Sequence, residues 1–348
     1  MESWLRIIHL TKVGFSEFNV YQPLLKQKRR KEHCSVTVCV AAIAQWEGNS
    51  LVIGASDRMV TAGDIEFEQE QMKIHGLTSS IAIMVAGDLC TQMDILYEVE
   101  AWKNEQINEH PEVWLSVKRT ADKFNESLIA ARRKAARDAI LAPLNMDYAD
   151  LSSPNVSADL ATQLSKEIYQ FQFPSIEALV IGLDTLGAHV YLVDGVKGVC
   201  CHDWQGFAAI GYGAWHANSQ MMFAGHTKHR GLAETVMLVY SAKKRAEVAP
   251  GVGEKTDMIA IGTGLGNSTT IGNPLMALLD DTFHTSQKQS ENVRKDANEK
   301  ITNFFQVPSG EASVQSQGTP ELESGSPGET EDEEASAGGS TKADAIID

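Results

Sequence analysis

The chain has 348 residues, of which 43% are hydrophobic, and its formal net charge is −16 at pH 7. This length and composition allow a full hydrophobic core, whereas no apolar run is long enough to predict a membrane span. The acidic balance argues against a nucleic-acid partner, because nucleic-acid binding needs a basic surface that neutralises phosphates.

Residues 1–36 read as a basic, irregular arm. This arm lacks the compact apolar block and the small-residue cleavage site of a secretory signal. We therefore expect a cytoplasmic protein that has no membrane anchor. The globular body is expected to begin after the arm and to extend over residues 37–283.

The body opens with predicted strands. Residues 37–45 (TVCVAAIAQ) and 49–57 (NSLVIGASD) are β-branched and apolar, and the short segment WEGN between them suits a tight hairpin turn. Residues 73–87 predict a further strand pair around the polar stretch LTSS. These strands are close in sequence, which favours antiparallel pairing.

Two amphipathic helices are expected next. Residues 88–106 begin with an Asp that suits an N-cap, and residues 113–141 place apolar side chains at helical spacing. Residues 143–173 begin with turn signals and end in a short helical pattern, so they are expected to be an insertion.

The second half of the body repeats this order. Strands are predicted over residues 176–201 and 207–211, helices over 214–224 and 232–247, and a last strand over 256–264. Runs of strands followed by runs of helices predict an α+β fold rather than alternating βαβ units.

The C-terminal residues 284–348 are polar and are expected to be a disordered, acidic tail. From residue 308 onward they include ten acidic residues and one lysine, so about nine of the sixteen excess negative charges lie there. Such a segment offers too little apolar surface to offset the entropy lost on ordering. It is either a solubilising tail or a docking element for a partner.

The cysteines predict neither a disulfide framework nor a zinc site, because their number is odd and no CxxC pair occurs. They are Cys34, Cys39, Cys90, Cys200 and Cys201.

The stretch GTGLG at residues 262–266 lacks the GxGxxG spacing of a dinucleotide loop and predicts a turn between strands. We expect no metal and no cofactor.

One group of residues follows the second strand at fixed intervals. Thr61 lies four residues after Asp57, Lys73 sixteen after it, and Gly87 fourteen after Lys73. Together with Arg58 and Gly63, this pattern resembles the N-terminal half of proteasome β-subunits and their simpler bacterial relatives. The resemblance extends over about residues 37 to 275. It implies the four-layer αββα sandwich of two antiparallel sheets that characterises N-terminal-nucleophile hydrolases.

The resemblance also implies a set of catalytic roles. Thr37 would supply the nucleophilic hydroxyl, and its own α-amino group would accept the proton, since that amine is substantially neutral near pH 8. Asp57 would pair with Lys73, whose charge favours the ionised hydroxyl. The backbone N–H of Gly87 would stabilise the oxyanion.

Substrate contacts follow from the same offsets. Thr61 and Gly63 would bind the substrate backbone as an added strand. The side chain before the scissile bond would enter a mostly apolar pocket lined by Val60, Gln71, Val85 and Leu89. The pocket predicts a preference for Leu, Phe or Tyr over charged residues.

The N-terminal chemistry requires Thr37 to begin the mature chain, yet 36 residues precede it. Three explanations stay open. The arm is a propeptide removed by autolysis, or translation begins at Val36 through a GTG codon and the methionine is trimmed, or the arm is retained and the protein is inactive. Cys34, Ser35 and Cys39 are rival nucleophiles, although the spacing favours Thr37.

The second half departs from the proteolytic pattern. Proteolytic members carry a Ser in a GSG turn and an Asp and a Ser before a Gly, whereas this chain has Tyr212, Ala246 and Ala249. A one-residue slip in the alignment would place Glu247 at the Asp position.

Three functions are therefore compatible with the sequence. The first is a threonine peptidase that assembles as a homo-oligomeric ring and acts on peptides or unfolded proteins, with an unfoldase or another partner docking on the acidic tail. The second is a catalytically inactive ring or scaffold subunit, and the third is a small-molecule amidase of the same superfamily.

Overall fold

A computed structural model describes residues 37–62, 65–68, 70, 72–262 and 267–306. The chain divides into two compact units, residues 1–288 and 289–348. The first unit contains the described sheets, all the helices before the last one, and the last helix as far as residue 288. Every paired strand in the described ranges is antiparallel, which confirms the predicted α+β class.

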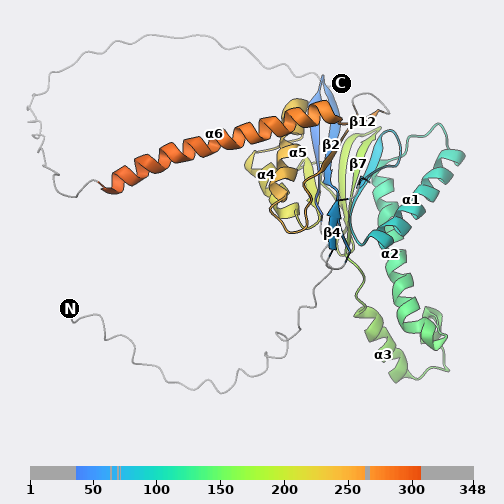
Figure 1. Cartoon of the computed structure of the whole chain (residues 1–348). Helices are drawn as coiled ribbons and strands as arrows, with labels where there is room; N and C mark the ends of the chain where they lie inside the picture. Colours follow the sequence, from blue (N-terminus) through green and yellow to red (C-terminus); the bar gives the residue numbers. More distant parts are fainter. Residues whose placement is uncertain (1–36, 63–64, 69, 71, 263–266, 307–348) are drawn as a thin grey trace, which may run out of the picture. The chain divides into compact units, whose positions relative to one another are not determined.

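The first five-stranded sheet contains the N-terminal hairpin of the body (Figure 1). Its order is β10-β1-β2-β11-β12. These strands are β1 (Cys39–Trp46), β2 (Asn49–Asp57), β10 (Phe207–Ile210), β11 (Thr256–Ile261) and β12 (Ser268–Thr270). The predicted hairpin is therefore correct, and β11 from the far end of the body becomes a neighbour of β2.

The turn of this hairpin sets its register. Glu47 and Gly48 have φ values of 50° and 81°, the left-handed conformation that a two-residue turn requires. Trp46 therefore pairs with Asn49, and each step along the ladder brings Cys39 opposite Ser56. The start of β1 and the end of β2 consequently lie side by side.

The second five-stranded sheet has the order β5-β6-β7-β8-β9. Its strands are β5 (Ile74–Gly76), β6 (Ile81–Gly87), β7 (Ile176–Asp184), β8 (Gly187–Asp194) and β9 (Gly198–Cys201). A separate two-stranded sheet is formed by β3 (Met59–Ala62) and β4 (Ile65–Glu68).

Within the described residues, six α-helices accompany the sheets (Figure 1). They are α1 (Leu89–Glu109), α2 (Val117–Ala136), α3 (Ala158–Tyr169), α4 (Ala214–Phe223), α5 (Leu232–Ala246) and α6 (Asn273–Gln306). The predicted N-cap is confirmed, because the Asp88 side chain accepts a hydrogen bond from the Thr91 amide at 2.9 Å. The second helix begins later than predicted, since Ser116 caps it, and its last predicted residues form a π-helical turn over Arg137–Leu141.

Three apolar clusters show how these elements pack. In β6, Ile81, Ile83 and Val85 belong to the cluster beneath α1 and α2, whereas the alternating residues Ala82, Met84 and Ala86 face the first sheet. The opposite face of the first sheet packs against α4, α5 and the first turns of α6. The order is thus helices, sheet, sheet, helices. Each fully buried aliphatic side chain contributes roughly 1.5–3 kcal/mol to stability.

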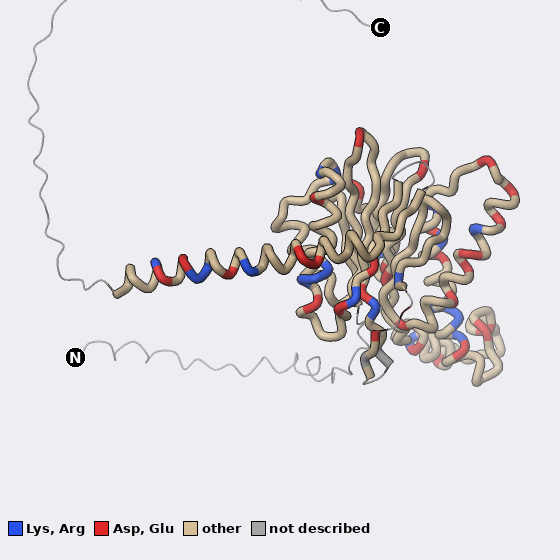
Figure 2. Tube along the Cα trace, turned by 45° about the horizontal axis from the view of Figure 1, so that its top comes forward, with Lys and Arg blue, Asp and Glu red and all other residues tan. Residues whose placement is uncertain are grey.

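The expected disorder over residues 284–306 is wrong, because α6 continues through them. Phe283 is the last buried residue of α6, and every residue from 284 to 306 is exposed. These residues are polar but include good helix formers, and oppositely charged residues follow one another along the helix (Figure 2). Glu291 and Lys295 form an i,i+4 pair at 3.4 Å. Residues 307–348 lie outside the described part.

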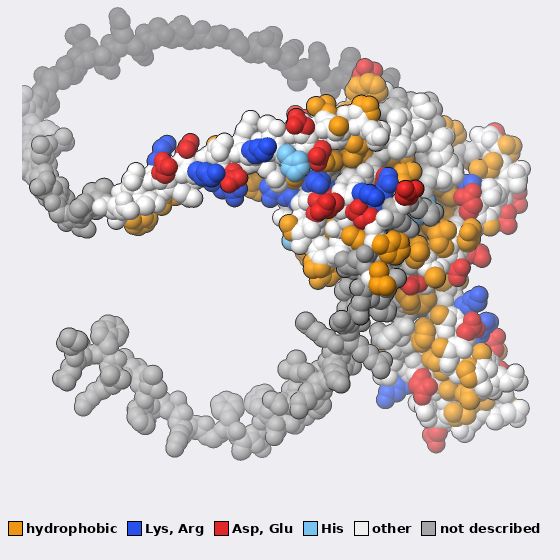
Figure 3. All heavy atoms as spheres, in the orientation of Figure 1, with side chains coloured by type: hydrophobic (Ala, Val, Ile, Leu, Met, Phe, Trp, Pro, Cys, Tyr) orange, Lys and Arg blue, Asp and Glu red, His pale blue; other side chains and the backbone are white. Residues whose placement is uncertain are grey.

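The expected insertion, residues 143–173, contains two short 3₁₀ turns, Ala142–Leu144 and Tyr148–Ser152, followed by α3. Leu164 is the buried residue of α3, and none of the fully described residues of this helix belongs to the three apolar clusters. Apolar side chains reach the surface over this segment (Figure 3). α3 is therefore peripheral to the core, whereas Phe173 at the end of the segment packs against the cluster beneath α1 and α2.

Among the described helices, none combines the length and the apolar character that crossing a membrane would require.

A partly buried histidine in β8 links the end of β7 to the segment that follows β9. The His189 Nδ1 lies 2.6 Å from Asp203 Oδ2, and its Nε2 lies 3.1 Å from Asp184 Oδ1. The hydrogen bond with Asp203 raises the pKa of His189 most, partial burial opposes this, and the charges of Asp203 and Asp184 raise it further. The Tyr191 ring lies beside the imidazole, with centroids 5.8 Å apart. The imidazole ring thus bridges two carboxylates.

This arrangement predicts a pH-dependent contribution to stability. Because the folded-state pKa is raised, the contribution is complete below the ordinary histidine pKa of about 6.5 and is lost as the pH rises through the folded-state value. We expect His189→Gln to lower the free energy of unfolding more at about pH 5.5 than at about pH 8.5. Urea unfolding of both proteins at the two pH values measures this. An equal difference at both values would contradict the linkage.

Candidate active site

Three residues expected to act together meet at one edge of the two sheets. Thr37 lies two residues before the start of β1, Asp57 ends β2, and Lys73 directly precedes β5 of the other sheet. The Asp57 amide donates to the Val38 carbonyl at 3.2 Å, so the β1–β2 ladder continues past its last named pair. The hairpin register therefore brings Thr37 beside Asp57.

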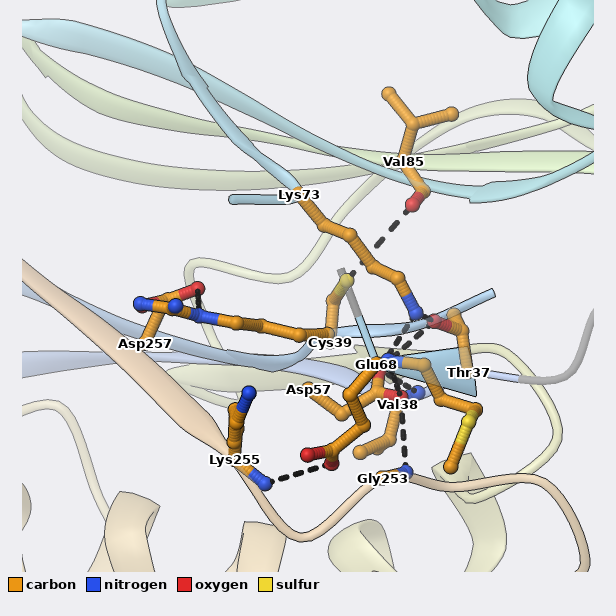
Figure 4. Close-up of polar contacts among 12 residues, drawn as sticks. Thr37, Val38, Cys39, Asp57, Glu68, Lys73, Val85, Gly253, Lys255 and Asp257 are labelled. Atoms are coloured by element: carbon orange, nitrogen blue, oxygen red, sulfur yellow. Dashed lines mark hydrogen bonds and ion pairs between the residues drawn. The ribbon is translucent and has the colours of Figure 1, made fainter. Parts of the chain in front are cut away.

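The Asp57 carboxylate is the centre of this group (Figure 4). Its Oδ1 accepts from the Thr37 hydroxyl at 2.7 Å, from the Val38 amide at 3.0 Å and from Lys73 Nζ at 2.9 Å. Its Oδ2 accepts from the amides of Met59 and Gly253, both at 3.0 Å. Lys73 Nζ also donates to Thr37 Oγ1. One hydroxyl oxygen is thus held between a carboxylate and an ammonium.

Burial strengthens these interactions. Asp57 has no exposed surface, Thr37 is 3% exposed and the Lys73 side chain is 12% exposed. A carboxylate is stable at such a position only when it is paired and hydrogen-bonded, because the cost of desolvating it is several kcal/mol. The five donors, one of which is the Lys73 ammonium, satisfy that requirement.

Cys39 is not available as an alternative nucleophile. It is fully buried between the sheets, and its Sγ lies 4.0 Å from the Val85 carbonyl oxygen. Burial raises the pKa of the Cys39 thiol far above its usual range, and the nearby charge of Lys73 offsets only part of this. The reactive form is the thiolate, so Cys39 is a structural residue. Cys34 and Ser35, the other rivals, lie outside the described residues.

The turn over residues 211–213 encloses Thr37. The Gly213 amide donates to the Thr37 carbonyl at 3.1 Å. Gly211 has a φ of +82°, and a Cβ at this position would lie 2.5 Å from the Thr37 carbonyl oxygen. Only glycine fits such an approach. Between the glycines, Tyr212 is 47% exposed.

Gly87 lies at the same edge as Thr37. Glu177 is paired with Ala86, the residue before Gly87, and its carboxylate accepts from the Gly211 amide at 2.8 Å. Gly211 in turn packs against the backbone of Thr37, so Glu177 connects the β6–β7 pair to the turn around Thr37. The role of the Gly87 N–H as the oxyanion donor stays a prediction.

Gly87→Ala is expected to disturb both stability and activity. Gly87 has a φ of +139°, and an added Cβ would lie 2.4 Å from the Ser175 carbonyl oxygen. The backbone strain alone costs about 1–3 kcal/mol. Thermal unfolding and peptide hydrolysis measure the two effects. Gly76→Ala is the matched control, because an added Cβ at Gly76 meets no atom within 4 Å. A Gly87→Ala protein with the wild-type melting temperature would contradict the expectation.

The expected substrate-binding residues are only partly described. Val60 and Thr61 lie in β3, whereas Gly63 and Gln71 lie outside the described residues. Leu89, at the first turn of α1, is 43% exposed.

Val85 differs from the other pocket residues. It is 2% exposed and packs beneath α1, on the face of β6 that points away from the first sheet. If the predicted pocket lies between β6 and α1, the Val85 side chain lines only its bottom. The apolar pocket stays a prediction.

Several residues that support the site were not anticipated from the sequence. Gly253 and Lys255 lie in the loop between α5 and β11, and the Lys255 amide donates to Glu68 Oε1 at 2.9 Å (Figure 4). Arg58 forms a two-pronged ion pair with the buried Asp257, with distances of 2.8 and 2.5 Å. No local pattern links these positions, because they lie about 190 residues apart.

The two alanines expected at the Asp and second Ser positions of proteolytic proteasome subunits are buried. Ala246 has no exposed surface and Ala249 is 4% exposed. Glu247 does not take over the role of the Asp, because its Oε1 is bound by Lys243 Nζ at 2.6 Å and by Lys244 Nζ at 2.9 Å. No carboxylate from this helix end therefore reaches Thr37 within the described structure.

Among the described side chains, no group of three or more His, Cys, Asp or Glu residues is arranged to hold a metal ion.

No protein-family model matches the chain, and no curated protein sequence matches it.

Proposed function

We propose that this protein is a proteasome-type threonine peptidase whose nucleophile is Thr37. The observation that carries the proposal is the Thr37 hydroxyl, which donates to buried Asp57 and accepts from Lys73. These residue types at these positions can activate a hydroxyl for attack on a carbonyl. A purely structural role explains the arrangement less well, since burying an ion pair next to a threonine rarely stabilises a fold.

The packing order of helices, sheet, sheet and helices supports assignment to the four-layer αββα sandwich of N-terminal-nucleophile hydrolases. The location of Thr37 at the first strand of that sandwich supports the same assignment. Fold analogy by itself fixes no activity, so the proposal depends on the geometry around Thr37.

The proposed reaction proceeds through an acyl-enzyme. After cleavage before Thr37, the free α-amino group accepts the hydroxyl proton while Oγ1 bonds to the substrate carbonyl carbon. Lys73 stabilises the negative charge that develops on Oγ1, and the Gly87 N–H donates to the oxyanion, which is worth about 3 kcal/mol. The C–N bond then breaks, the amine leaves with the proton, and water hydrolyses the ester.

The natural setting is also part of the proposal. We infer a cytoplasmic homo-oligomeric ring that encloses the sites and takes peptides or unfolded proteins as substrates. An unfoldase or another partner would deliver them, with residues 308–348 as its docking element.

A second function is favoured by one specific observation. Tyr212, Ala246 and Ala249 stand where proteolytic members have the Ser, Asp and Ser that orient the amino terminus, and the two alanines are buried and have no polar group. An inactive ring or scaffold subunit of the same fold would tolerate these residues. A small-molecule amidase would use the same nucleophile on a non-peptide substrate.

Two measurements on the purified protein test these functions. Intact mass reports whether the mature chain begins at Thr37, as either hydrolase requires. A panel of fluorogenic peptides that differ only before the scissile bond is expected to show preferred turnover of Leu, Phe or Tyr. A stable chain that retains its arm and hydrolyses no peptide would support the scaffold. A chain that begins at Thr37 and cleaves only non-peptide amides would support the amidase.

A further inference from the structure

A second buried cation lies behind Asp57, on the side away from Thr37. Lys243, in the last turns of α5, has no exposed surface. Its Nζ donates to the Gly253 carbonyl at 2.7 Å, to the Glu254 carbonyl at 2.8 Å and to Glu247 Oε1 at 2.6 Å. An ammonium has three donors, so every one of them is used.

The loop that Lys243 holds is the same loop that holds Asp57. The Gly253 amide donates to Asp57 Oδ2 at 3.0 Å, while the carbonyl of the same residue accepts from Lys243. In the same loop, the amide of Lys255 donates a hydrogen bond to Glu68 Oε1. Residues 253–255 are therefore held by a cation on their carbonyls and by two carboxylates on their amides.

Close packing leaves this loop little freedom. A Cβ added at Gly253 would lie 2.5 Å from Glu68 Oε1 and 3.1 Å from both the Met59 amide nitrogen and its Cβ. Met59 is the other residue whose amide binds Asp57 Oδ2. The two amides that orient this oxygen thus come from segments packed directly against each other.

An apolar side chain would fill the Lys243 position at lower cost. Desolvating an ammonium costs several kcal/mol, and hydrophobic replacements of buried ion pairs are often neutral or stabilising. Burial accordingly lowers the pKa of Lys243, while the hydrogen bond and charge of Glu247 act in the opposite direction. Stability alone therefore does not account for a lysine here, whereas orientation of the loop does.

We propose that Lys243 is a positioning residue, which holds the Gly253 amide against Asp57 and thereby sets the orientation of the Asp57 carboxylate toward Thr37 and Lys73. The catalytic part of this inference rests on the proposed function. The structural part, the clamp on residues 253–255, does not.

The first test compares Lys243→Met with Lys244→Met. Lys244 is the matched control, because it also pairs with Glu247 but does not contact the loop in the described contacts. We expect Lys243→Met to lower kcat about 10- to 100-fold with little change in KM, since a misplaced catalytic group affects the reaction more than binding. Lys244→Met is expected to keep the wild-type kcat. A wild-type kcat in Lys243→Met would overturn the inference.

The second test separates positioning from mere stabilisation. Lys243→Met combined with Lys244→Met and Glu247→Met removes all three charges of this cluster, so the melting temperature is expected to recover relative to the single variant. The loop carbonyls still lack their donor, and kcat is expected to stay low. Recovery of kcat together with the melting temperature would overturn the inference.

A third measurement does not depend on activity. Hydrogen exchange of the segment 251–257 is expected to be faster in Lys243→Met than in wild type and unchanged in Lys244→Met. Equal exchange in all three proteins would refute the clamp. If no protein, wild type included, hydrolyses any substrate, the proposed function fails, and hydrogen exchange still decides the clamp.

Discussion

Replacing Thr37 by alanine is expected to abolish hydrolysis and to leave the fold intact. The variant loses the only proposed nucleophilic atom, and in comparable catalytic units such a loss lowers kcat by about 10⁶-fold. It also loses one hydrogen bond to Asp57, which is worth about 1 kcal/mol. Turnover of a fluorogenic peptide and thermal unfolding, measured on the same preparations, report the two effects.

Thr37→Ser is the matched control for this experiment. Serine keeps the hydroxyl that donates to Asp57 and accepts from Lys73, and it loses only the methyl group. Partial activity in Thr37→Ser beside none in Thr37→Ala identifies the oxygen as the reacting group. Activity in Thr37→Ala would eliminate Thr37 as the nucleophile.

Lys73→Met is expected to lower both activity and stability. The variant removes the charge beside the Thr37 hydroxyl, so hydrolysis is expected to fall nearly as far as in Thr37→Ala. It also leaves the fully buried Asp57 carboxylate without a cation, which destabilises a protein by about 3–5 kcal/mol. Peptide turnover and urea unfolding measure these changes.

Two further variants test whether the loss of stability is specific to the buried pair of Lys73 and Asp57. Lys118 forms an exposed pair with Asp122 at 2.7 Å, so Lys118→Met is expected to change stability by less than about 1 kcal/mol. Lys73→Met combined with Asp57→Asn removes both buried charges, and we expect stability to recover in part while activity stays absent. Wild-type turnover in Lys73→Met would exclude Lys73 from the reaction.

The sequence alone determined the local elements and the nucleus of the site. Runs of apolar and β-branched residues predicted β1 and β2, and the turn at Glu47 and Gly48 determines their register. Once that register is set, Val38 lies opposite Asp57, because residues at matching distances from a two-residue turn lie opposite each other, and Thr37, the residue before Val38, lies beside the same carboxylate. The N-cap at Asp88 could also be predicted from the sequence, because the Thr91 amide that it binds is only three residues away.

The sequence-based prediction failed where a polar composition was taken to exclude helix formation. Residues 284–306 are polar and exposed, and polarity predicted disorder, yet they continue α6. Helix propensity and pairs such as Glu291 with Lys295 act within one turn and do not depend on burial. Val85 shows a related limit of sequence reasoning. The strand pattern predicts that side chains alternate between two faces of β6, but it does not show which face packs against the other sheet and which against the helices.

Only the tertiary structure decided which distant groups complete the site. Gly253, Glu177 and Lys243 reach Thr37 or Asp57, directly or through one residue, from segments more than 100 residues away along the chain. Glycine, glutamate and lysine are common surface residues, and nothing in their immediate sequence marks them. Their positions follow from β11 pairing with β2 and from the two sheets packing face to face. Those arrangements are selected by the burial of apolar surface summed over the whole chain, which no local window contains.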